Sequence, residues 1–455
     1  MLARVFFRLA ALAVVLHALL ASPEQTVPAS ADSGSRLNLN ADFVRSPTPL
    51  LWRFIDAVLG VGPFPSLFAL ESENIIAHAR RKGCAKFASD QGYWRRALDA
   101  LTHSIAVDKP AISNTGRFML FEQLSNNLCI QHAVSNLLET HGANITSQRI
   151  VRPVIIAGPP RTGSTFLLSL LSRHPNATAV TYLEAVEPVA PWFVPTRLLC
   201  TPLDPRYYKI VFATSLVHWL LPSFSSLFGN LNFDGPFEEM QLGAVVFGST
   251  LFVAEMVLPT YSAWLLTHDQ TPMEVYTKLL LQVIQFQRGG PARTWILKSP
   301  QNSEMLYAKA AVFPDAVHVF TQRNLSEIIE SLVAMLAYTS KVFNRNDQDL
   351  RALAMLWLKR LKVTGEQLTQ DYVDRHVSRD RQLFVTFADL VRDPMEHAAT
   401  IFAAAGLPFG AAERARLELY LASNVRQGSV KFRYDVKSFG VSQTEIDQAV
   451  GRRTV

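Results

Sequence analysis

Residues 153–171 read PVIIAGPPRTGSTFLLSLL, so a buried-strand pattern, a glycine-bounded loop and an apolar helix follow one another directly. A short apolar run that ends in glycine predicts a strand, and the Ser/Thr-rich start of STFLLSLL predicts a helix. A strand joined to a helix by a Gly-x-x-x-x-Gly loop has the outline of a phosphate-binding loop. The stretch therefore favours an α/β fold with an anion site at the end of one strand.

The loop differs from that of nucleoside triphosphatases in the place of its cation. Ser164 follows the second glycine, where such a loop has lysine, and Arg161 stands two residues before that glycine. The missing lysine argues against transfer of the γ-phosphoryl group of ATP. Glycines allow close approach of the backbone to a phosphate, and the arginine fork suits one. The predicted contacts are Arg161, Thr162, Gly163, Ser164, Thr165 and Phe166.

Further apolar runs, each followed by a helical pattern, predict more strands of the same sheet. Strands that alternate with helices favour a central, mostly parallel sheet covered by helices on both faces. Ligands of such sheets bind outside the carboxyl ends of the strands, where this chain has Glu184, Lys298 and Arg323. The runs are 177–184, 294–299, 316–323 and 382–390.

The segment RNLSEIIESL, residues 323–332, predicts a second anion contact. Arg323 ends a predicted strand, and Ser331 follows about two helical turns later, so both could face the cleft. Together they could bind a second phosphate of the same nucleotide. Lys298, in WILKSP, is the only charge at the end of its buried-looking strand.

These stretches together resemble the sulfotransferase superfamily, which uses 3′-phosphoadenosine 5′-phosphosulfate (PAPS). PPRTGSTFLLSLLSRHP is similar to its 5′-phosphosulfate loop, RNLSEIIESL to its 3′-phosphate element, and WILKSP to a subgroup with an LKSP motif. The likeness extends over roughly residues 70–450. It implies a P-loop NTPase-like topology behind an N-terminal helical preface, and an enzyme that moves a sulfuryl group from PAPS, without a metal, to a hydroxyl or amine. The acceptor stays open: a glycan, a protein, a lipid or a small molecule.

The resemblance also suggests catalytic roles. Arg161 and Lys298 would stabilise charge in the transition state. Glu184, just after the second predicted strand, matches the glutamate that carbohydrate and tyrosyl-protein sulfotransferases use as the base. Many members of the LKSP subgroup have a histidine where this chain has Asn302, so one familiar base is missing. Other candidates for the base are Glu187, Glu238 and Glu239.

Two other functions compete with this reading. A P-loop kinase would bind ATP with magnesium, but the loop lacks the lysine it needs. A catalytically inactive relative would keep the nucleotide site without turnover, and Asn302 in place of histidine gives that alternative some support. The aromatic residues of 185–290 would suit an acceptor pocket, and they would equally suit an ordinary core.

The N-terminus predicts entry into the secretory pathway. Arg4 and Arg8 precede an apolar stretch at residues 9–21, which favours a signal peptide or an uncleaved membrane anchor. We therefore expect a Golgi-lumen protein held by this anchor, or a protein secreted after cleavage. The expected divisions are the signal peptide or anchor at 1–22, a polar linker at 23–45, a helical region at 46–150 and the α/β domain at 151–455.

Charge and cysteine content limit the partners and the metal chemistry. The net charge of +6 has no Lys/Arg cluster, which argues against nucleic acid. The three cysteines, Cys84, Cys129 and Cys200, have no C-x-x-C spacing, so a zinc site is not expected, while one disulfide is possible in an oxidising compartment. Asn144 opens a glycosylation sequon in a predicted loop. We expect the apolar stretch 210–228 to be a buried core helix or hairpin rather than a membrane span.

Overall fold

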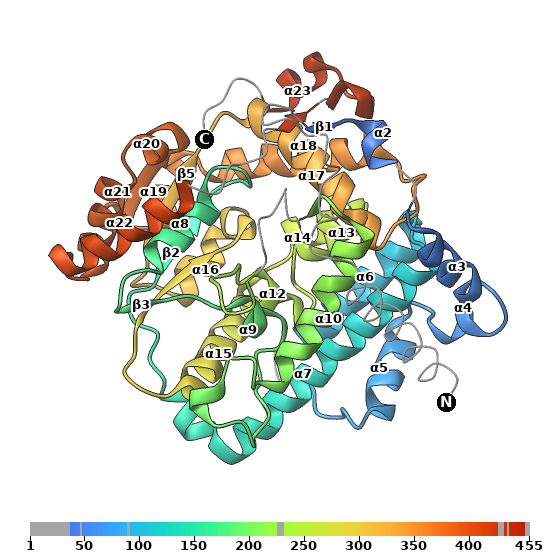
Figure 1. Ribbon diagram of the computed structural model, residues 1–455, viewed down its shortest axis with the longest axis horizontal. Helices are drawn as coiled ribbons and strands as arrows, with labels where there is room; N and C mark the ends of the chain where they lie inside the picture. Colours follow the sequence, from blue (N-terminus) through green and yellow to red (C-terminus); the bar gives the residue numbers. More distant parts are fainter. Residues whose placement is uncertain are drawn as a thin grey trace.

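Five parallel strands form the central sheet of the computed structural model (Figure 1), which describes residues 37–45, 48–88, 92–224, 232–425, 432–434 and 436–450. The strand order is β3-β4-β2-β5-β6, and every neighbouring pair is parallel. This confirms the predicted α/β class. The strands are β2 (Val154–Ala157), β3 (Ala177–Thr178), β4 (Thr294–Lys298), β5 (Val317–Gln322) and β6 (Gln382–Thr386).

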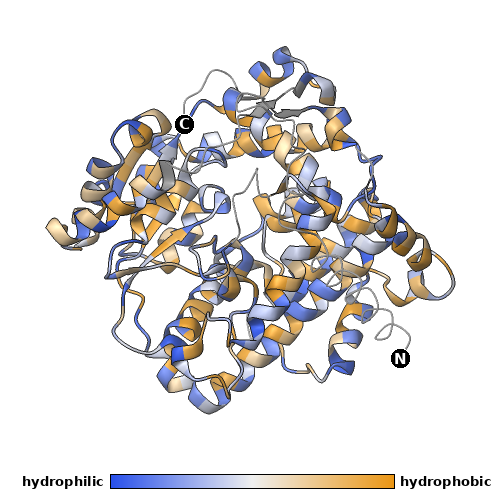
Figure 2. Ribbon diagram, viewed as in Figure 1, coloured by the Kyte–Doolittle hydropathy of each residue, from blue (hydrophilic) through white to orange (hydrophobic). Residues whose placement is uncertain are grey.

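Helices cover both faces of this sheet, as the strand patterns predict. Side chains alternate along β2, so Val154 and Ile156 join one apolar core while Ile155 and Ala157 join another. Figure 2 shows the strands mostly in the colour of apolar residues, as a sheet buried on both faces requires. The first core includes α8 (Ser164–Leu171), α21 (Pro394–Ala405) and α22 (Ala411–Val425), and the second includes α15 (Thr271–Arg288), α16 (Leu306–Val312), α17 (Leu325–Thr339) and α18 (Leu350–Gln367).

The expected helical preface is present and packs on the second core. Its long helix α7 lies against both α5 and α15. Asn144 lies in the last turn of α7, so the prediction of a loop at that sequon is wrong. The helices are α3 (Leu50–Leu59), α4 (Phe64–Leu67), α5 (Ser72–Arg81), α6 (Tyr93–Asp108) and α7 (Asn114–Thr146).

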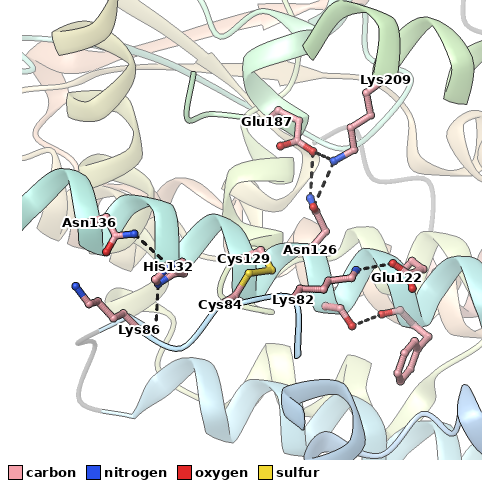
Figure 3. The surroundings of a disulfide bond; sticks show 12 residues. Lys82, Cys84, Lys86, Glu122, Asn126, Cys129, His132, Asn136, Glu187 and Lys209 are labelled. Atoms are coloured by element: carbon pink, nitrogen blue, oxygen red, sulfur yellow. Dashed lines mark hydrogen bonds and ion pairs between the residues drawn. A yellow bond between two sulfur atoms is a disulfide. The ribbon is translucent and has the colours of Figure 1, made fainter. Parts of the chain in front are cut away.

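A disulfide joins Cys84, just after α5, to Cys129 in α7 (Figure 3). Ion pairs and hydrogen bonds involve other residues of the same helix. On one side of the disulfide, Lys82 forms an ion pair with Glu122 at 2.6 Å. Cys200 is a free thiol. The single disulfide that the cysteine content allows therefore forms, and it fastens the chain after α5 to the longest helix.

The predicted linker 23–45 reaches too far along the chain. Residues 37–45 belong to the fold, because β1 (Leu37–Leu39) pairs in parallel with β7 (Phe432–Tyr434) and α2 (Ala41–Val44) follows at once. Two of the α2 side chains are buried. These two, Ala41 and Val44, are apolar residues within a segment that is otherwise largely polar.

The stretch 210–228, expected to be a buried core helix or hairpin, is a half-buried helix that packs on the core as far as the structure describes it. Most of its described part lies in α10 (Pro205–Leu220), where only Arg206, Ile210 and Leu220 are buried. Leu216 and Val217 of this helix pack against the core, and Leu221, just after it, is fully buried. Within the described ranges, no helix is both long and apolar enough to cross a membrane. The predicted signal peptide or anchor, residues 1–22, lies outside the described residues.

The structure contains seven further α-helices among the described residues. They are α9 (Tyr182–Val186), α12 (Met240–Ala244), α13 (Leu251–Glu255), α14 (Pro259–Thr267), α19 (Gln370–His376), α20 (Phe387–Arg392) and α23 (Gln443–Val450). β3 is shorter than the expected 177–184, because the Thr181 side chain caps α9 and ends the extended segment.

Candidate active site

The loop between β2 and α8 is fixed against the end of β5. The Thr162 hydroxyl donates to the Pro159 carbonyl at 2.9 Å and lies 2.7 Å from the Thr321 hydroxyl. A Cβ on Gly158 would lie 2.0 Å from Thr321 Oγ1, so only glycine fits there. Thr162 is fully buried with these partners, so its hydroxyl is engaged within the protein.

The start of α8 presents free backbone amides. Its N-cap is Gly163, at φ +82°, and no side chain caps the helix in the described structure. The first amides of a helix have no carbonyl partner within it, and the helix dipole favours an anion at this end. The amides of Ser164, Thr165 and Phe166 are therefore available, while the Phe166 ring is half-buried and stacks near Tyr420.

Three predicted anion contacts lie together beside this loop. Arg161 donates from Nε to the Ser331 hydroxyl at 2.9 Å, and Arg323 donates from Nη1 to the Arg161 carbonyl at 3.0 Å. Arg323 also pairs with Glu327 at 3.2 Å and lies over the Phe387 ring. In the part of the chain that the structure describes, no carboxylate pairs with Arg161. Its charge is thus available to an anionic ligand.

Lys298 closes the site from the neighbouring strand. It ends β4, and its backbone pairs with Ile156 of β2, directly before the loop. Its ammonium donates to Thr165 Oγ1 at 3.1 Å and forms an ion pair with Glu238. The lysine side chain is only 5% exposed, so the charge is directed at the start of α8 rather than at bulk solvent.

Glu184 is placed differently from the other candidates. Its carboxylate accepts from the Thr181 backbone at 3.0 Å and hydroxyl at 2.8 Å, in the capping box of α9, and from Arg288 Nε at 2.7 Å and Nη2 at 2.5 Å. Burial alone would raise the pKa of Glu184, but the Arg288 guanidinium and the Thr181 hydrogen bonds more than offset that effect and lower it. Both carboxylate oxygens are engaged.

The surroundings of Glu184 are a separate cavity of about 430 Å³, lined also by Cys200, Arg288 and Arg293. None of the hydrogen bonds or ion pairs found for Glu184 in the described residues reaches Lys298 or the loop. Its role as the base stays a prediction, and this geometry argues against it.

A buried charged cluster behind the loop was not visible in the sequence. Asn302 donates to Ile156 O at 3.1 Å and to Glu239 Oε1 at 2.8 Å. Lys309 bridges Glu239 at 3.3 Å and Glu274 at 2.8 Å. Burial would lower the pKa of Lys309, but the two carboxylates raise it. Asn302, which stands where the resemblance expects histidine, therefore anchors this cluster.

The aromatic residues of 185–290 do not gather at one place. Trp192 is 93% exposed, whereas Tyr261 is fully buried and stacks with Trp264 in the core. An acceptor pocket built from this segment stays a prediction. Among the described residues, no three His, Cys, Asp or Glu side chains are grouped as metal ligands would be.

Comparisons with known proteins identify the family and the fold. Residues 153–411, more than half of the chain, match the profile of the sulfotransferase family. No curated protein matches the chain in sequence.

Two solved structures share the fold. Sulfotransferase STF1 from Mycobacterium tuberculosis H37Rv has a TM-score of 0.70 at 20% identity, over 83% of this chain and 97% of its own. Sulfotransferase STF9 from Mycobacterium avium has a TM-score of 0.71 at 22% identity, over 84% of this chain and 95% of its own. With its profile match spanning the loop, the strand ends and the helices of the site, this chain belongs to the sulfotransferase family and is a transferase enzyme.

Proposed function

We propose that this enzyme transfers a sulfuryl group from PAPS to a hydroxyl or amine acceptor. One observation carries the proposal: Arg161, Arg323 and Ser331 come together beside the uncapped start of α8, with Lys298 on its other side. Two groups of anion-binding residues lie at the same edge of the sheet, where its strands end, and they suit a nucleotide that carries two separate anionic groups.

Each of these two groups of residues would bind a different anionic end of PAPS. The α8 amides, the Ser164 and Thr165 hydroxyls and Lys298 would bind the 5′-phosphosulfate, because a helix N-terminus and a fixed cation both favour an anion. Arg323 and Ser331 would bind the 3′-phosphate. Arg161 lies between them, since it contacts Ser331 through its side chain and Arg323 through its carbonyl.

The chain's residues would assist the transfer by charge and hydrogen bonding. PAPS supplies the sulfuryl group and a bisphosphate leaving group. Lys298 and Arg161 would stabilise the negative charge that develops where the bond to the phosphate breaks. Their cations lie in a partly buried site, where such interactions are stronger than in water. A base would accept the proton of the acceptor.

Binding calorimetry on the full chain tests the donor. The ligands are adenosine 3′,5′-bisphosphate, AMP, and ATP with magnesium. Strong preference for the bisphosphate is the expected result. Preference for ATP with magnesium would replace this proposal by a kinase, and no binding to any of the three would end it.

Sulfate transfer from labelled PAPS to a panel of alcohols, phenols, amines and sugars then tests turnover. Transfer to at least one acceptor is expected. Bisphosphate binding without transfer to any of them would favour the inactive relative.

We also propose that the enzyme works in the secretory pathway, in the Golgi lumen or after secretion. The Cys84–Cys129 disulfide supports this, because structural disulfides persist in oxidising compartments. The apolar segment 9–21 would supply the signal peptide or anchor. Protease protection of the full chain in intact microsomes is expected, and digestion without detergent would contradict the proposal.

A further inference from the structure

We propose that Glu238 is the general base of the transfer and that it works as a pair with Lys298. The inference rests on the proposed function, since a base is needed only if an acceptor is sulfated. It departs from the resemblance, which points to Glu184 instead.

Glu238 lies at the site itself. Its Oε1 contacts the Lys298 ammonium, and the same ammonium donates to Thr165 Oγ1 at 3.1 Å, at the start of α8. The Glu238 side chain is 22% exposed and that of Lys298 is 5% exposed. The carboxylate thus lies one contact away from the anion-binding loop, on the solvent side of the lysine, where an acceptor can approach.

Glu238 also has an oxygen to spare. Among the described residues, its only hydrogen-bond or ion-pair partner is Lys298, through Oε1, so Oε2 can accept a proton. Both oxygens of Glu184 are held by Thr181 and Arg288.

The remaining candidates are committed elsewhere. Glu239 is 2% exposed and bonded to Asn302 and Lys309. Glu187, at the C-terminal end of α9, pairs with Lys209 and Asn126. Of the four carboxylates that the sequence offers as the base, Glu238 alone combines exposure, a free oxygen and contact with the site.

The backbone around Glu238 holds it in place. The preceding residue, Phe237, donates its amide to the Val180 carbonyl at 2.8 Å. The next residue, Glu239, donates its amide to the Lys298 carbonyl at 3.3 Å, and its side chain enters the buried cluster with Lys309. Since both neighbours are anchored, the Glu238 backbone is fixed, and the contact with Lys298 orients the carboxylate, as positioning of a base requires. The adjacent pair Glu238–Glu239 therefore divides into one anchoring and one reacting carboxylate.

The step balances as an in-line displacement. The acceptor oxygen or nitrogen forms a bond to sulfur while the bond from sulfur to the 5′-phosphate oxygen breaks, and its electron pair stays on that oxygen. Glu238 Oε2 takes the acceptor's proton and later releases it to water. Lys298 faces the leaving oxygen. The products are the sulfated acceptor, adenosine 3′,5′-bisphosphate and one proton.

The test compares the full-length protein with Glu238→Gln, which keeps the shape and removes the base. The substrate is labelled PAPS, with water as the acceptor in one arm and the alcohol, phenol and amine panel in the other. We expect kcat to fall about 100-fold, the lower end of the range for loss of a general base. Affinity for adenosine 3′,5′-bisphosphate should not fall, because Lys298 stays in place and loses only an anionic partner.

Two further variants separate a base from a structural role. Glu122→Gln is the control, because Glu122, in α7 and outside the site, also pairs with a lysine, Lys82, although it is more exposed and contacts His78 as well. It should keep the wild-type kcat. Glu238→Ala should regain activity in proportion to added formate, a small carboxylate that can take the place of the lost one. A merely structural role would show no such rescue.

The outcomes distinguish this inference from the proposed function. A wild-type kcat in Glu238→Gln, or no rescue by formate in Glu238→Ala, would overturn Glu238 as the base. Wild-type protein that binds the bisphosphate but transfers sulfate to neither water nor the panel would overturn it as well, while leaving the nucleotide site intact. Failure of the wild-type protein to bind the bisphosphate would instead contradict the proposed function.

Discussion

Arg323 lies between the end of β5 and the start of α17, and its contacts predict which phosphate it recognises. Its guanidinium donates to the Arg161 carbonyl, and among the described residues Glu327, which is exposed, is its one acidic partner, so a phosphate can displace that partner. Arg323→Ala should weaken binding of adenosine 3′,5′-bisphosphate about 30-fold, or about 2 kcal/mol, as loss of a hydrogen bond to a charged group does. Calorimetry should show little change for AMP.

The matched control for this prediction is Arg379→Ala. Arg379 is an exposed arginine paired with Asp374, outside the site. The Arg379→Ala variant should bind both nucleotides as tightly as the wild-type protein does. Equal losses of bisphosphate and AMP affinity in Arg323→Ala would remove its assignment to the 3′-phosphate.

His318 predicts how stability depends on pH. It lies in β5, 2% exposed, and burial lowers its pKa from 6.5 to about 4. Between these values the unfolded chain binds the proton and the folded chain does not, so stability falls as the pH falls below 6.5. From pH 7 to pH 5 the loss should be about 2 kcal/mol. Denaturant unfolding of His318→Leu should show a smaller drop over that interval, and an unchanged drop would contradict the prediction.

Single residues of the site divide clearly into those that the sequence could place and those that it could not. Arg161, Lys298 and Arg323 were predictable because each follows a strand, and the carboxyl ends of parallel strands meet at one edge. The partner of Glu184 was not predictable. Arg288 lies 104 positions further along the chain, and only the folded structure brings it near.

At the scale of the elements, α9 depends on Glu184 for its attachment to the sheet. The carboxylate caps the helix through Thr181 and pairs with Arg288 at the end of α15, which also bonds Thr178 of β3. Glu184→Gln should lower the free energy of unfolding by about 3 kcal/mol, because Arg288 loses the charge that compensates its burial. Denaturant titration measures this.

Thr181→Ala serves as the graded comparison. It removes the cap and keeps the ion pair, so about 1 kcal/mol should be lost. A Glu184→Gln protein with unchanged stability and lost turnover would instead support Glu184 as the base.

The bounds of most strands of the central sheet could be predicted from the residues within and next to each strand. β4, β5 and β6 lie within the apolar runs predicted for them. β3 was overestimated because a threonine cap outweighed the strand pattern after residue 178. The pairing of β1 with β7 joins segments nearly 400 positions apart, so no local pattern could indicate it.

On the scale of the whole molecule, the helical preface shares the second of the two cores with the α/β domain. Leu101 and Leu124 of the preface belong to the same apolar cluster as Leu280 of α15 and Phe320 of β5. The predicted boundary at residue 151 therefore does not separate two independent cores. Unfolding should consequently occur as one cooperative transition, which a single midpoint by both fluorescence and circular dichroism would show.

The Cys84–Cys129 disulfide closes a loop of 45 residues within this shared core. Reduction should therefore destabilise the whole enzyme and not the preface alone. Loop-closure entropy gives a loss of about 4 kcal/mol for a loop of this length. Cys84→Ser/Cys129→Ser should unfold at a lower denaturant concentration, still in one transition, and a reductant should have no further effect on it. A separate early transition of the preface would show that the shared core does not couple the two parts. An unchanged midpoint would show that the disulfide adds nothing to what α5 and α7 already gain by packing together.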